Sequence, residues 1–317
     1  DNMRLAFFGT PEIAATVLRC LHRLGHDLVL VVSQPDKPKG RGQQLMATPV
    51  KQAALELGLL CQQPETIKNN REFQQSFSEL NLDLVVVAAY GKIIPPDLLS
   101  LPQHGFINLH ASLLPKYRGA APVQWALLNG EKATGMTIFK IIEQLDAGPI
   151  IDQAAVEIGD DEDAGQLLAR LFQLGCGRLE NCLAAINNNS AKYIVQDESL
   201  ATLAPTLKKE MGKINWQKSA REIHNQIRGL VLWPTAYAEW QEKRLKILKA
   251  RPFASPLLTK NGRAGLVEEV VRGEGFIVQC GQGKIEILEV QPESGRPMSG
   301  YNFAIGHKLI PGETLLK

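Results

Sequence analysis

The feature that most constrains the fold is a strand–helix–strand pattern at the start of the chain. An apolar run at 3–8 is followed by an apolar-periodic stretch at 11–24 and a β-branched run at 28–32. Pro11 suits the first position of a helix, and Thr10 suits its N-cap. Strands that alternate with helices are typical of a parallel sheet with helices packed on it. The sequence therefore predicts an α/β domain.

The same pattern continues along the chain. Residues 83–89 (DLVVVAA) are apolar at every position after the aspartate, as expected for a central strand that is covered on both faces. Shorter strands are predicted at 106–109, 134–142 and 150–158. A long helix is predicted at 164–186, where acidic residues just before it suit a helix N-terminus.

The pattern changes in the last third of the chain. Residues 191–207 lack a strong period and fit a linker between a first domain at 1–190 and a second at 208–317. A helix is predicted at 220–230, and short strand-like runs separated by Gly, Pro or Asn-Gly follow between 235 and 290. Closely spaced short strands predict a small β-rich domain, for which an OB-like barrel is one candidate.

Charge is distributed unevenly between these parts. Residues 205–317 hold 18 lysine and arginine residues against 11 glutamates, a net charge of +7, whereas residues 1–204 carry −5. Such asymmetry suggests that the last third binds a polyanion, nucleic acid being the obvious one. A solvated basic face without a partner is the alternative.

Composition excludes several classes of protein. With 44% apolar and 21% charged residues in 317, the chain has room for two domains and is unlike a disordered protein. No apolar run approaches the ~18 residues that a membrane-spanning helix needs. Acidic Glu12 near the start does not fit a signal peptide. The five cysteines include no C-x-x-C pair, which argues against a disulfide framework or zinc ribbon. We therefore expect a cytoplasmic protein without membrane association.

The turn around Gly9 (FFGTPE) does not fit a dinucleotide site. The G-x-G-x-x-G signature uses three glycines to let a pyrophosphate approach a helix N-terminus, and only Gly9 is present. We expect a tight strand-to-helix turn at this place.

The densest group of chemically useful residues is NLHASLLPKYRG at 108–119. Asn108 and His110 are two apart, so their side chains share one face of an extended strand end. An amide donor beside an imidazole is suited to holding the oxyanion of an attacked carbonyl. Asp146 lies in the glycine-bounded segment QLDAGPI, from which its carboxylate could reach the histidine. A purely structural role is the alternative for each residue taken alone.

The stretches INLHASLLPKYRGAAPVQWALLNGE and TGMTIFKIIEQLDAGPI closely resemble the formyltransferases that use 10-formyltetrahydrofolate. The resemblance implies a Rossmann-like catalytic domain with Asn108, His110 and Asp146 as its catalytic trio. Asn108 and protonated His110 would hold the oxyanion, and Asp146 would orient His110. No metal is expected. The family's folate-contacting segment maps onto Ser112, Leu113, Leu114 and Pro115.

A narrower resemblance is to the members of this family that formylate methionyl-tRNA. It is carried by FFGTPEIAA, by SQPDKPKGRGQQLMATPVK and by the basic β-rich module after the first domain. It implies formyl transfer from 10-formyltetrahydrofolate to the α-amine of methionine on charged initiator tRNA, for translation initiation. Arg41, with Lys37 and Lys39, lies in the extended basic loop 34–46 that would contact the tRNA. The implied partners are methionyl-initiator tRNA and folate, and we expect a monomer.

Other readings stay open at this point. Glycinamide ribonucleotide formyltransferases share the trio, but these shorter enzymes do not explain the last third of the chain. Sugar-nucleotide formyltransferases carry a second domain and are the stronger enzymatic alternative. Formyltetrahydrofolate hydrolases need no acceptor at all. An RNA-binding module with a vestigial Rossmann-like half is the non-enzymatic alternative, against which the retained trio argues.

Overall fold

The computed structural model describes residues 1–254 and 262–317, which divide into two compact units. The first unit comprises 1–122, 133–156 and 168–204, and the second comprises 123–132, 157–167 and 205–317. The domain limits expected from the sequence stay a prediction. Within the expected linker, however, the segment 191–204 belongs to the first compact unit.

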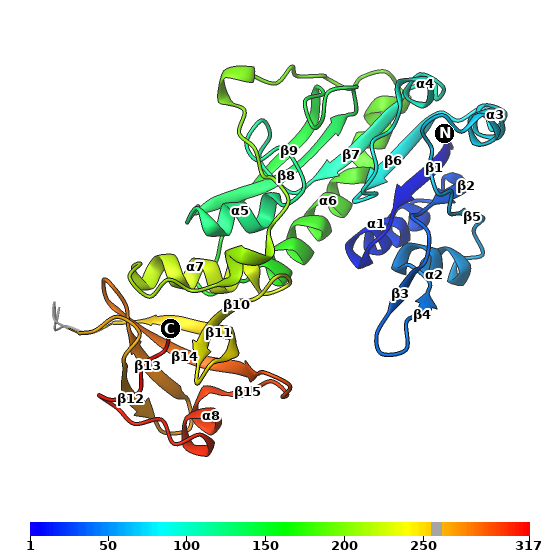
Figure 1. Cartoon of the computed structure of the whole chain (residues 1–317). Helices are drawn as coiled ribbons and strands as arrows, with labels where there is room; N and C mark the ends of the chain where they lie inside the picture. Colours follow the sequence, from blue (N-terminus) through cyan, green and yellow to red (C-terminus); the bar gives the residue numbers. More distant parts are fainter. Residues whose placement is uncertain (255–261) are drawn as a thin grey trace. The chain divides into compact units, whose positions relative to one another are not determined.

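A seven-stranded sheet forms the centre of the first unit, in the order β5-β2-β1-β6-β7-β8-β9 (Figure 1). The strands from β5 to β7 run parallel, and β8 is antiparallel to β7. All five residues of β6 are buried, which confirms the predicted central strand. The strand bounds are β1 (Arg4–Gly9), β2 (Asp27–Val32), β5 (Cys61–Gln62), β6 (Leu84–Ala88), β7 (Phe106–His110), β8 (Ala133–Lys140) and β9 (Ile150–Glu157).

The first predicted helix is present, but its N-cap prediction is wrong. Helix α1 begins at Glu12, and Pro11 occupies the N-cap without a side-chain capping bond. The hydroxyl of Thr10 instead donates to the carbonyl of Tyr90 at 2.9 Å, beyond the end of β6. The side chain of Thr10 therefore makes a tertiary hydrogen bond instead of capping the helix.

Four further helices, α2 to α5, lie between the first predicted helix and the long one. The long predicted helix is α6, one residue longer than expected at its C-terminal end. The bounds are α1 (Glu12–Arg23), α2 (Pro49–Glu56), α3 (Arg71–Ser78), α4 (Pro96–Leu99), α5 (Pro122–Leu128) and α6 (Ala164–Asn187), with a 3-10 turn at Glu198–Leu200.

An aromatic cluster fixes the carboxyl end of β1 against its neighbours. The ring of Phe8 meets those of Phe77, Phe106 and Tyr90 edge-on, with centroids 6.0, 5.6 and 5.3 Å apart. Edge-to-face pairs of this kind add stability beyond the apolar area that they bury. Burial also raises the pKa of Tyr90 to about 12, so its hydroxyl stays neutral. The loop that follows β6 is therefore anchored in the core.

The second unit contains the predicted β-rich fold. Its antiparallel strands lie in the order β10-β11-β14-β13-β12, with β15 paired to β14. Helix α7 has the same limits as the sequence predicted. The bounds are α7 (Ala220–Leu230), β10 (Ala236–Trp240), β11 (Lys243–Phe253), β12 (Val267–Val271), β13 (Gly275–Gln279), β14 (Lys284–Pro292), β15 (Met298–Ser299) and α8 (Gly300–Gly306), with a 3-10 turn at Lys209–Gly212.

Residues 314–317 close this sheet. The amide of Leu316 donates to the carbonyl of Gly265 at 2.8 Å, just before β12. The amide of Lys317 donates to the carbonyl of Glu239 in β10 at 2.9 Å, and the bond is returned in the opposite direction. The two outer strands are thus both paired, as closure into a small barrel requires.

We expect Leu316→Ala to lower the free energy of unfolding by about 2–5 kcal/mol, because it removes a fully packed side chain from the barrel core. Leu316 is buried, whereas the adjacent Leu315 is only half-buried. Leu315→Ala is therefore the matched control and should cost clearly less. Denaturant unfolding of both variants measures the difference, and equal losses would contradict the packing of the Leu316 side chain in the core of the second unit.

Candidate active site

A cavity of about 490 Å³ opens at the carboxyl ends of β6 and β7 in the first unit. Its wall includes the loop after β6, the end of β7, the loop 141–146 and side chains of α6. Carboxyl ends of parallel strands are where open α/β sheets bind ligands. Asn108, His110 and Asp146 all line it, so the structure brings the three predicted residues to one place.

His110 lies at the end of β7 with both ring nitrogens near oxygen atoms. Its Nε2 is 2.8 Å from the carbonyl of Tyr117, and its Nδ1 is 3.8 Å from Oδ2 of Asp146. Because a carbonyl only accepts, Nε2 carries the proton of that bond. The second distance is longer than a hydrogen bond. Nδ1 is therefore the ring nitrogen that is available for a hydrogen bond with a ligand.

Asp146 is held by both its main chain and its carboxylate. Its φ of +51° lies in the left-handed region, which aspartate tolerates better than most residues. The amide of Gly119 donates to Oδ2 at 2.8 Å, and the side-chain amide of Gln196 donates to the carbonyl at 2.9 Å. The side chains of Asp146 and His110 are only 9% and 7% exposed. The carboxylate is thus presented in a largely water-excluded position.

The side-chain amide of Asn108 has a buried oxygen, Oδ1, without a hydrogen-bond partner among the residues that the structure describes. A buried polar group without a partner is costly, and such groups are rare in folded proteins. An amide in this state beside a cavity is a group available to a ligand.

The predicted folate segment forms a turn after β7. The hydroxyl of Ser112 donates to the carbonyl of Lys116 at 2.7 Å, and the amide of Leu114 donates to the hydroxyl of Thr137 at 3.3 Å. This cavity is not lined by Ser112, Leu113, Leu114 or Pro115. Their contact with folate therefore stays a prediction.

Two polar residues that sequence reasoning missed lie beside this site. Gln196 and Glu198 sit within the segment expected to be a linker, yet both bind the guanidinium of Arg118. The carbonyl of Thr202 also accepts from the amide of Arg118 at 2.9 Å. The spacing of two between Gln196 and Glu198 was the one weak signal, because it places both side chains on one face of an extended segment.

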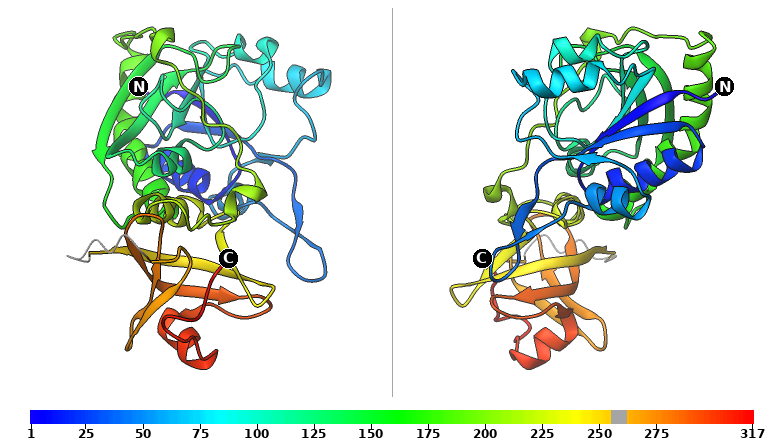
Figure 2. Two further views of the ribbon diagram at one scale, coloured as in Figure 1. Left: turned by 60° about the vertical axis from the view of Figure 1, so that its left-hand side comes forward. Right: turned by 90° about the vertical axis from the view of Figure 1, so that its right-hand side faces the viewer.

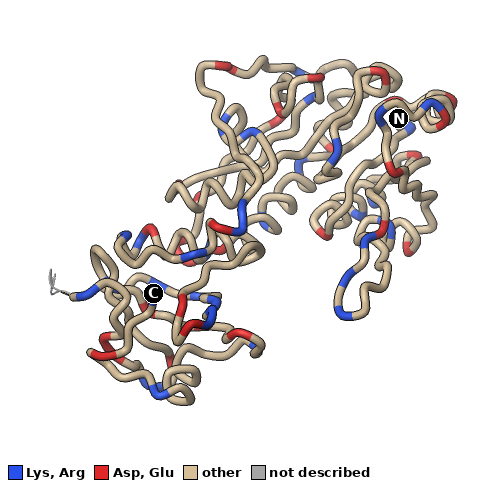
Figure 3. Tube along the Cα trace, viewed as in Figure 1, with Lys and Arg blue, Asp and Glu red and all other residues tan. Residues whose placement is uncertain are grey.

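The extended basic loop predicted at 34–46 contains a short hairpin. Strands β3 (Lys37–Lys39) and β4 (Gln44–Met46) pair antiparallel. Figures 1 and 2 show the hairpin extending away from the sheet of the first unit, and Figure 3 shows positive charge toward its tip. Lys37, Lys39 and Arg41 are exposed, and none is in an ion pair with another described residue.

The base of this hairpin is firmly bound to the first unit. Lys51 donates to the carboxylate of Asp36 at 3.1 Å, and the hydrogen bond from Gln63 together with Lys51 lowers the pKa of Asp36. The side-chain amide of Gln34 donates to the carbonyl of Tyr90 at 2.8 Å. A fixed base thus carries the exposed basic tip.

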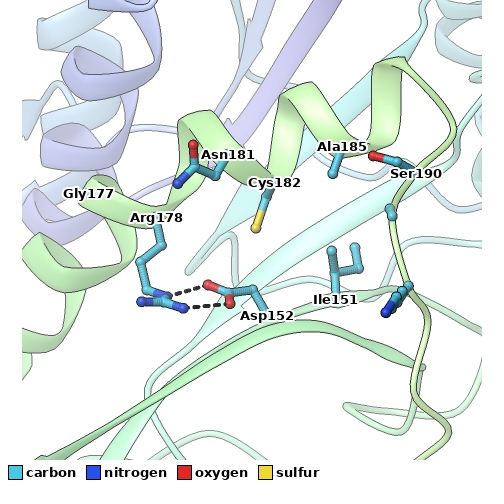
Figure 4. A pocket seen from close by; sticks show the side chains of 10 residues that line it. Ile151, Asp152, Gly177, Arg178, Asn181, Cys182, Ala185 and Ser190 are labelled. Carbon is cyan, nitrogen blue, oxygen red and sulfur yellow. Dashed lines mark hydrogen bonds and ion pairs between the residues drawn. The ribbon is translucent and has the colours of Figure 1, made fainter.

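A second hollow of about 400 Å³ lies along β9 and α6 (Figure 4). Arg178 donates from Nε and Nη2 to both carboxylate oxygens of Asp152, with 2.7 Å between Nη2 and Oδ1. The hydrogen bond to Asp152 raises the pKa of Arg178. This ion pair is satisfied within the protein, and the described lining contains no predicted site residue. The first cavity is therefore the candidate active site.

Within residues 1–254 and 262–317, no helix is both long and apolar enough to cross a bilayer. No group of three or more His, Cys, Asp or Glu side chains there is placed to hold a metal ion.

Comparison with known proteins gives matches along nearly the whole chain. Residues 3–179 match the family described as formyl transferase, and residues 206–308 match the formyl transferase C-terminal domain. A methionyl-tRNA formyltransferase of Caldanaerobacter subterraneus is 43% identical over 99% of this chain and 100% of its own length. The methionyl-tRNA formyltransferase of Moorella thermoacetica is 45% identical over 99% of both chains.

A solved structure shows the same fold. The N-formyltransferase of Helicobacter canadensis, determined with folinic acid and dTDP-3-aminofucose, superposes with a TM-score of 0.67. The match covers 92% of this chain and 100% of that one at 22% sequence identity.

We expect Gly119→Ala to lower the free energy of unfolding by more than ~1 kcal/mol, because φ at Gly119 is +122°. An added Cβ would also lie 2.7 Å from the carbonyl oxygen of Ala204. Gly177→Ala is the control, since Gly177 is helical and a Cβ there meets nothing within 4 Å. It should instead stabilise by about 0.5–1 kcal/mol. Denaturant unfolding should show changes in the free energy of unfolding with opposite signs for the two variants. Changes of the same sign would contradict the prediction.

Proposed function

Because the chain belongs to the formyl transferase family, we propose that it acts as its relatives named methionyl-tRNA formyltransferases do. It transfers the formyl group of 10-formyltetrahydrofolate to the α-amine of methionine on charged initiator tRNA, giving formylmethionyl-tRNA for translation initiation. The observation that carries this proposal is the meeting of Asn108, His110 and Asp146 at one cavity, in a chain similar to those enzymes over its full length.

The reaction is an acyl transfer from one nitrogen to another. The neutral α-amine attacks the formyl carbon, and the carbonyl electron pair moves to the formyl oxygen. The amine loses one proton, the bond from the formyl carbon to N10 breaks, and N10 gains one proton. Tetrahydrofolate and formylmethionyl-tRNA result. The barrier depends chiefly on how well the site stabilises the negative oxygen of the tetrahedral intermediate.

The geometry of the site suits these steps. Asn108 lines the cavity, where its side-chain NH₂ group can donate to the developing oxyanion. Nδ1 of His110 can donate to it as well, since Nε2 is already committed to Tyr117. The carboxylate of Asp146 stands 3.8 Å from Nδ1, so its negative charge faces the ring of His110. A proton passes from the amine toward N10 through His110 or Asp146.

A folate donor is supported by the family and by the cavity. The solved N-formyltransferase of Helicobacter canadensis binds folinic acid in the same fold. The cavity here combines the polar trio with apolar side chains such as Ile93, Ile142 and Leu145. Cofactor and substrate sites are commonly of this mixed kind. Contacts from Ser112–Pro115, a cytoplasmic location and a monomeric state are predictions that accompany the proposal.

The acceptor assignment rests on the basic elements outside the cavity. The hairpin tip exposes Lys37, Lys39 and Arg41, and residues 205–317 carry a net charge of +7. Such groups bind phosphates with little regard to sequence. An enzyme for a small acceptor has no evident need of them.

The first experiment is formyl transfer from 10-formyltetrahydrofolate to purified methionyl-initiator tRNA, with free methionine, an amino-sugar nucleotide and an acceptor-free reaction run in parallel. Transfer to the charged tRNA alone is the expected result. Transfer to the sugar nucleotide, or hydrolysis without any acceptor, would overturn the acceptor assignment.

We expect Asn108→Ala to lower kcat by about 10²–10³-fold, because one oxyanion donor is lost. Folate affinity should change little, since the amide is needed mainly in the transition state. Single-turnover rates and equilibrium folate binding measure the two effects separately. A near-normal rate would remove Asn108 from the mechanism.

We expect Arg41→Ala to weaken activity on tRNA far more than folate binding, since a guanidinium at an exposed tip contacts phosphate or base edges. Wild-type affinity for tRNA should also fall steeply with salt, and the variant should show a smaller slope. Binding titrations at several salt concentrations test both expectations. Equal losses for tRNA and folate would show that the hairpin acts structurally instead.

A further inference from the structure

We propose that Gln196 is a positioning residue for Asp146, and that Arg118 and Glu198 hold Gln196 in place. The inference rests on the proposed function, because Gln196 acts only through the carboxylate of Asp146. Nothing in the local sequence pattern assigns a role to Gln196, which lies 50 residues from Asp146 along the chain.

The side-chain amide of Gln196 donates hydrogen bonds to the loop that contains Asp146. Its Nε2 donates to the carbonyl of Asp146 at 2.9 Å and to the carbonyl of Gly148 at 2.8 Å. Gln196 is only 5% exposed, so water does not compete strongly for these bonds. Two carbonyls on either side of Ala147 are thus tied to one point. This clamp offsets the cost of keeping Asp146 at a φ of +51°.

Arg118 determines the orientation of the Gln196 side-chain amide. Its Nε and Nη2 donate to Oε1 of Gln196 at 3.2 and 2.9 Å. A reversed amide would place its NH₂ group against the guanidinium and its oxygen against two carbonyl oxygens. Both faces would then be repulsive. The arginine therefore selects the orientation in which Gln196 donates to the loop.

Glu198 completes the network from the solvent side. Its two carboxylate oxygens accept from Nη1 and Nη2 of Arg118 at 2.9 and 2.7 Å. Arg118 is buried, whereas the side chain of Glu198 is 61% exposed. The hydrogen bonds that Arg118 donates to Glu198 raise the pKa of the guanidinium. The buried cation thus has a bidentate partner, which is the geometry in which such a pair is strongest.

The same segment controls the carboxylate itself. Gly119, next to Arg118, donates its amide to Oδ2 of Asp146, and the carbonyl of Tyr117 binds Nε2 of His110. Residues 117–119 and Gln196 therefore determine the 3.8 Å separation between Oδ2 and Nδ1 of His110. Gln196, Arg118 and Glu198 do not line the cavity, so they reach the reaction through Asp146 rather than through substrate.

We expect Gln196→Ala to lower kcat by about 10- to 100-fold with the KM values for folate and tRNA nearly unchanged, because small misplacements of a catalytic group are costly. Gln226→Ala is the matched control. Gln226 also donates its amide to two carbonyls, those of Met211 and Lys213 at 2.8 and 3.1 Å, but it lies in the second unit. Its kcat should stay at the wild-type value. A normal kcat for Gln196→Ala would overturn the proposal.

A double-mutant cycle separates positioning from a general structural role. Gln196→Ala is measured in wild-type and in Asp146→Ala backgrounds. If Gln196 acts through Asp146, it should lower kcat only where Asp146 is present. The same fold-loss in both backgrounds would overturn the proposal. A normal kcat for Asp146→Ala alone would instead refute the proposed role of Asp146, so the two failures are distinguishable.

Gln196→Glu gives a second test if the alanine variant does not fold. The glutamate side chain has the same size and keeps an oxygen for Arg118, but at neutral pH it cannot donate to the carbonyls of Asp146 and Gly148. We expect a fall in kcat comparable to that of the alanine variant. Wild-type kcat in this variant would overturn the proposal.

Discussion

The hydrogen bond from the Gly119 amide to the Asp146 carboxylate joins two loops that the fold alone would leave independent. One loop follows β7 and contains the turn after His110. The other connects β8 and β9. Each approaches the cavity from a different strand, and the bond is 2.8 Å long with a charged acceptor, so it is among the stronger contacts of its kind. The relative positions of the trio depend on it.

That bond needs glycine at position 119, and the reason lies in a third segment. Residues 202–204 run beside residues 118–121, with bonds from Arg118 N to Thr202 O and from Ala204 N to Arg118 O. The approach leaves no room for a Cβ at Gly119. Residues 202–204 have no regular secondary structure, yet their backbone groups pair with those of the loop after β7 as a neighbouring strand would.

Much of this structure was predictable because its signals are local. The central strand at 84–88 is apolar at every position, and helix 220–230 begins with the capping box of Ser219 and Glu222. Asn108 and His110 share one strand end, so their meeting followed from spacing. Asp146 was singled out by its glycine-bounded segment and then by the resemblance, and the structure places it at the same cavity.

The features that escaped prediction depend on contacts distant in sequence. The hydroxyl of Thr10 binds a carbonyl 80 residues away, which no helix-start pattern reveals. Gln196 meets Arg118 across 78 residues, in a segment whose composition is that of a linker. The hairpin at 37–46 forms although its residues have little strand propensity, and the fixed base at Asp36 brings its two arms together.

The main-chain carbonyl of Tyr90 bears on which ligand groups the cavity can bind. The oxygen of Tyr90 accepts from the hydroxyl of Thr10 and from the amide of Gln34. A carbonyl oxygen has two lone pairs, and both are therefore occupied. Although Tyr90 lines the cavity, its main-chain oxygen is saturated as an acceptor. A hydrogen-bond donor of a ligand in this part of the cavity therefore needs an acceptor other than the Tyr90 carbonyl.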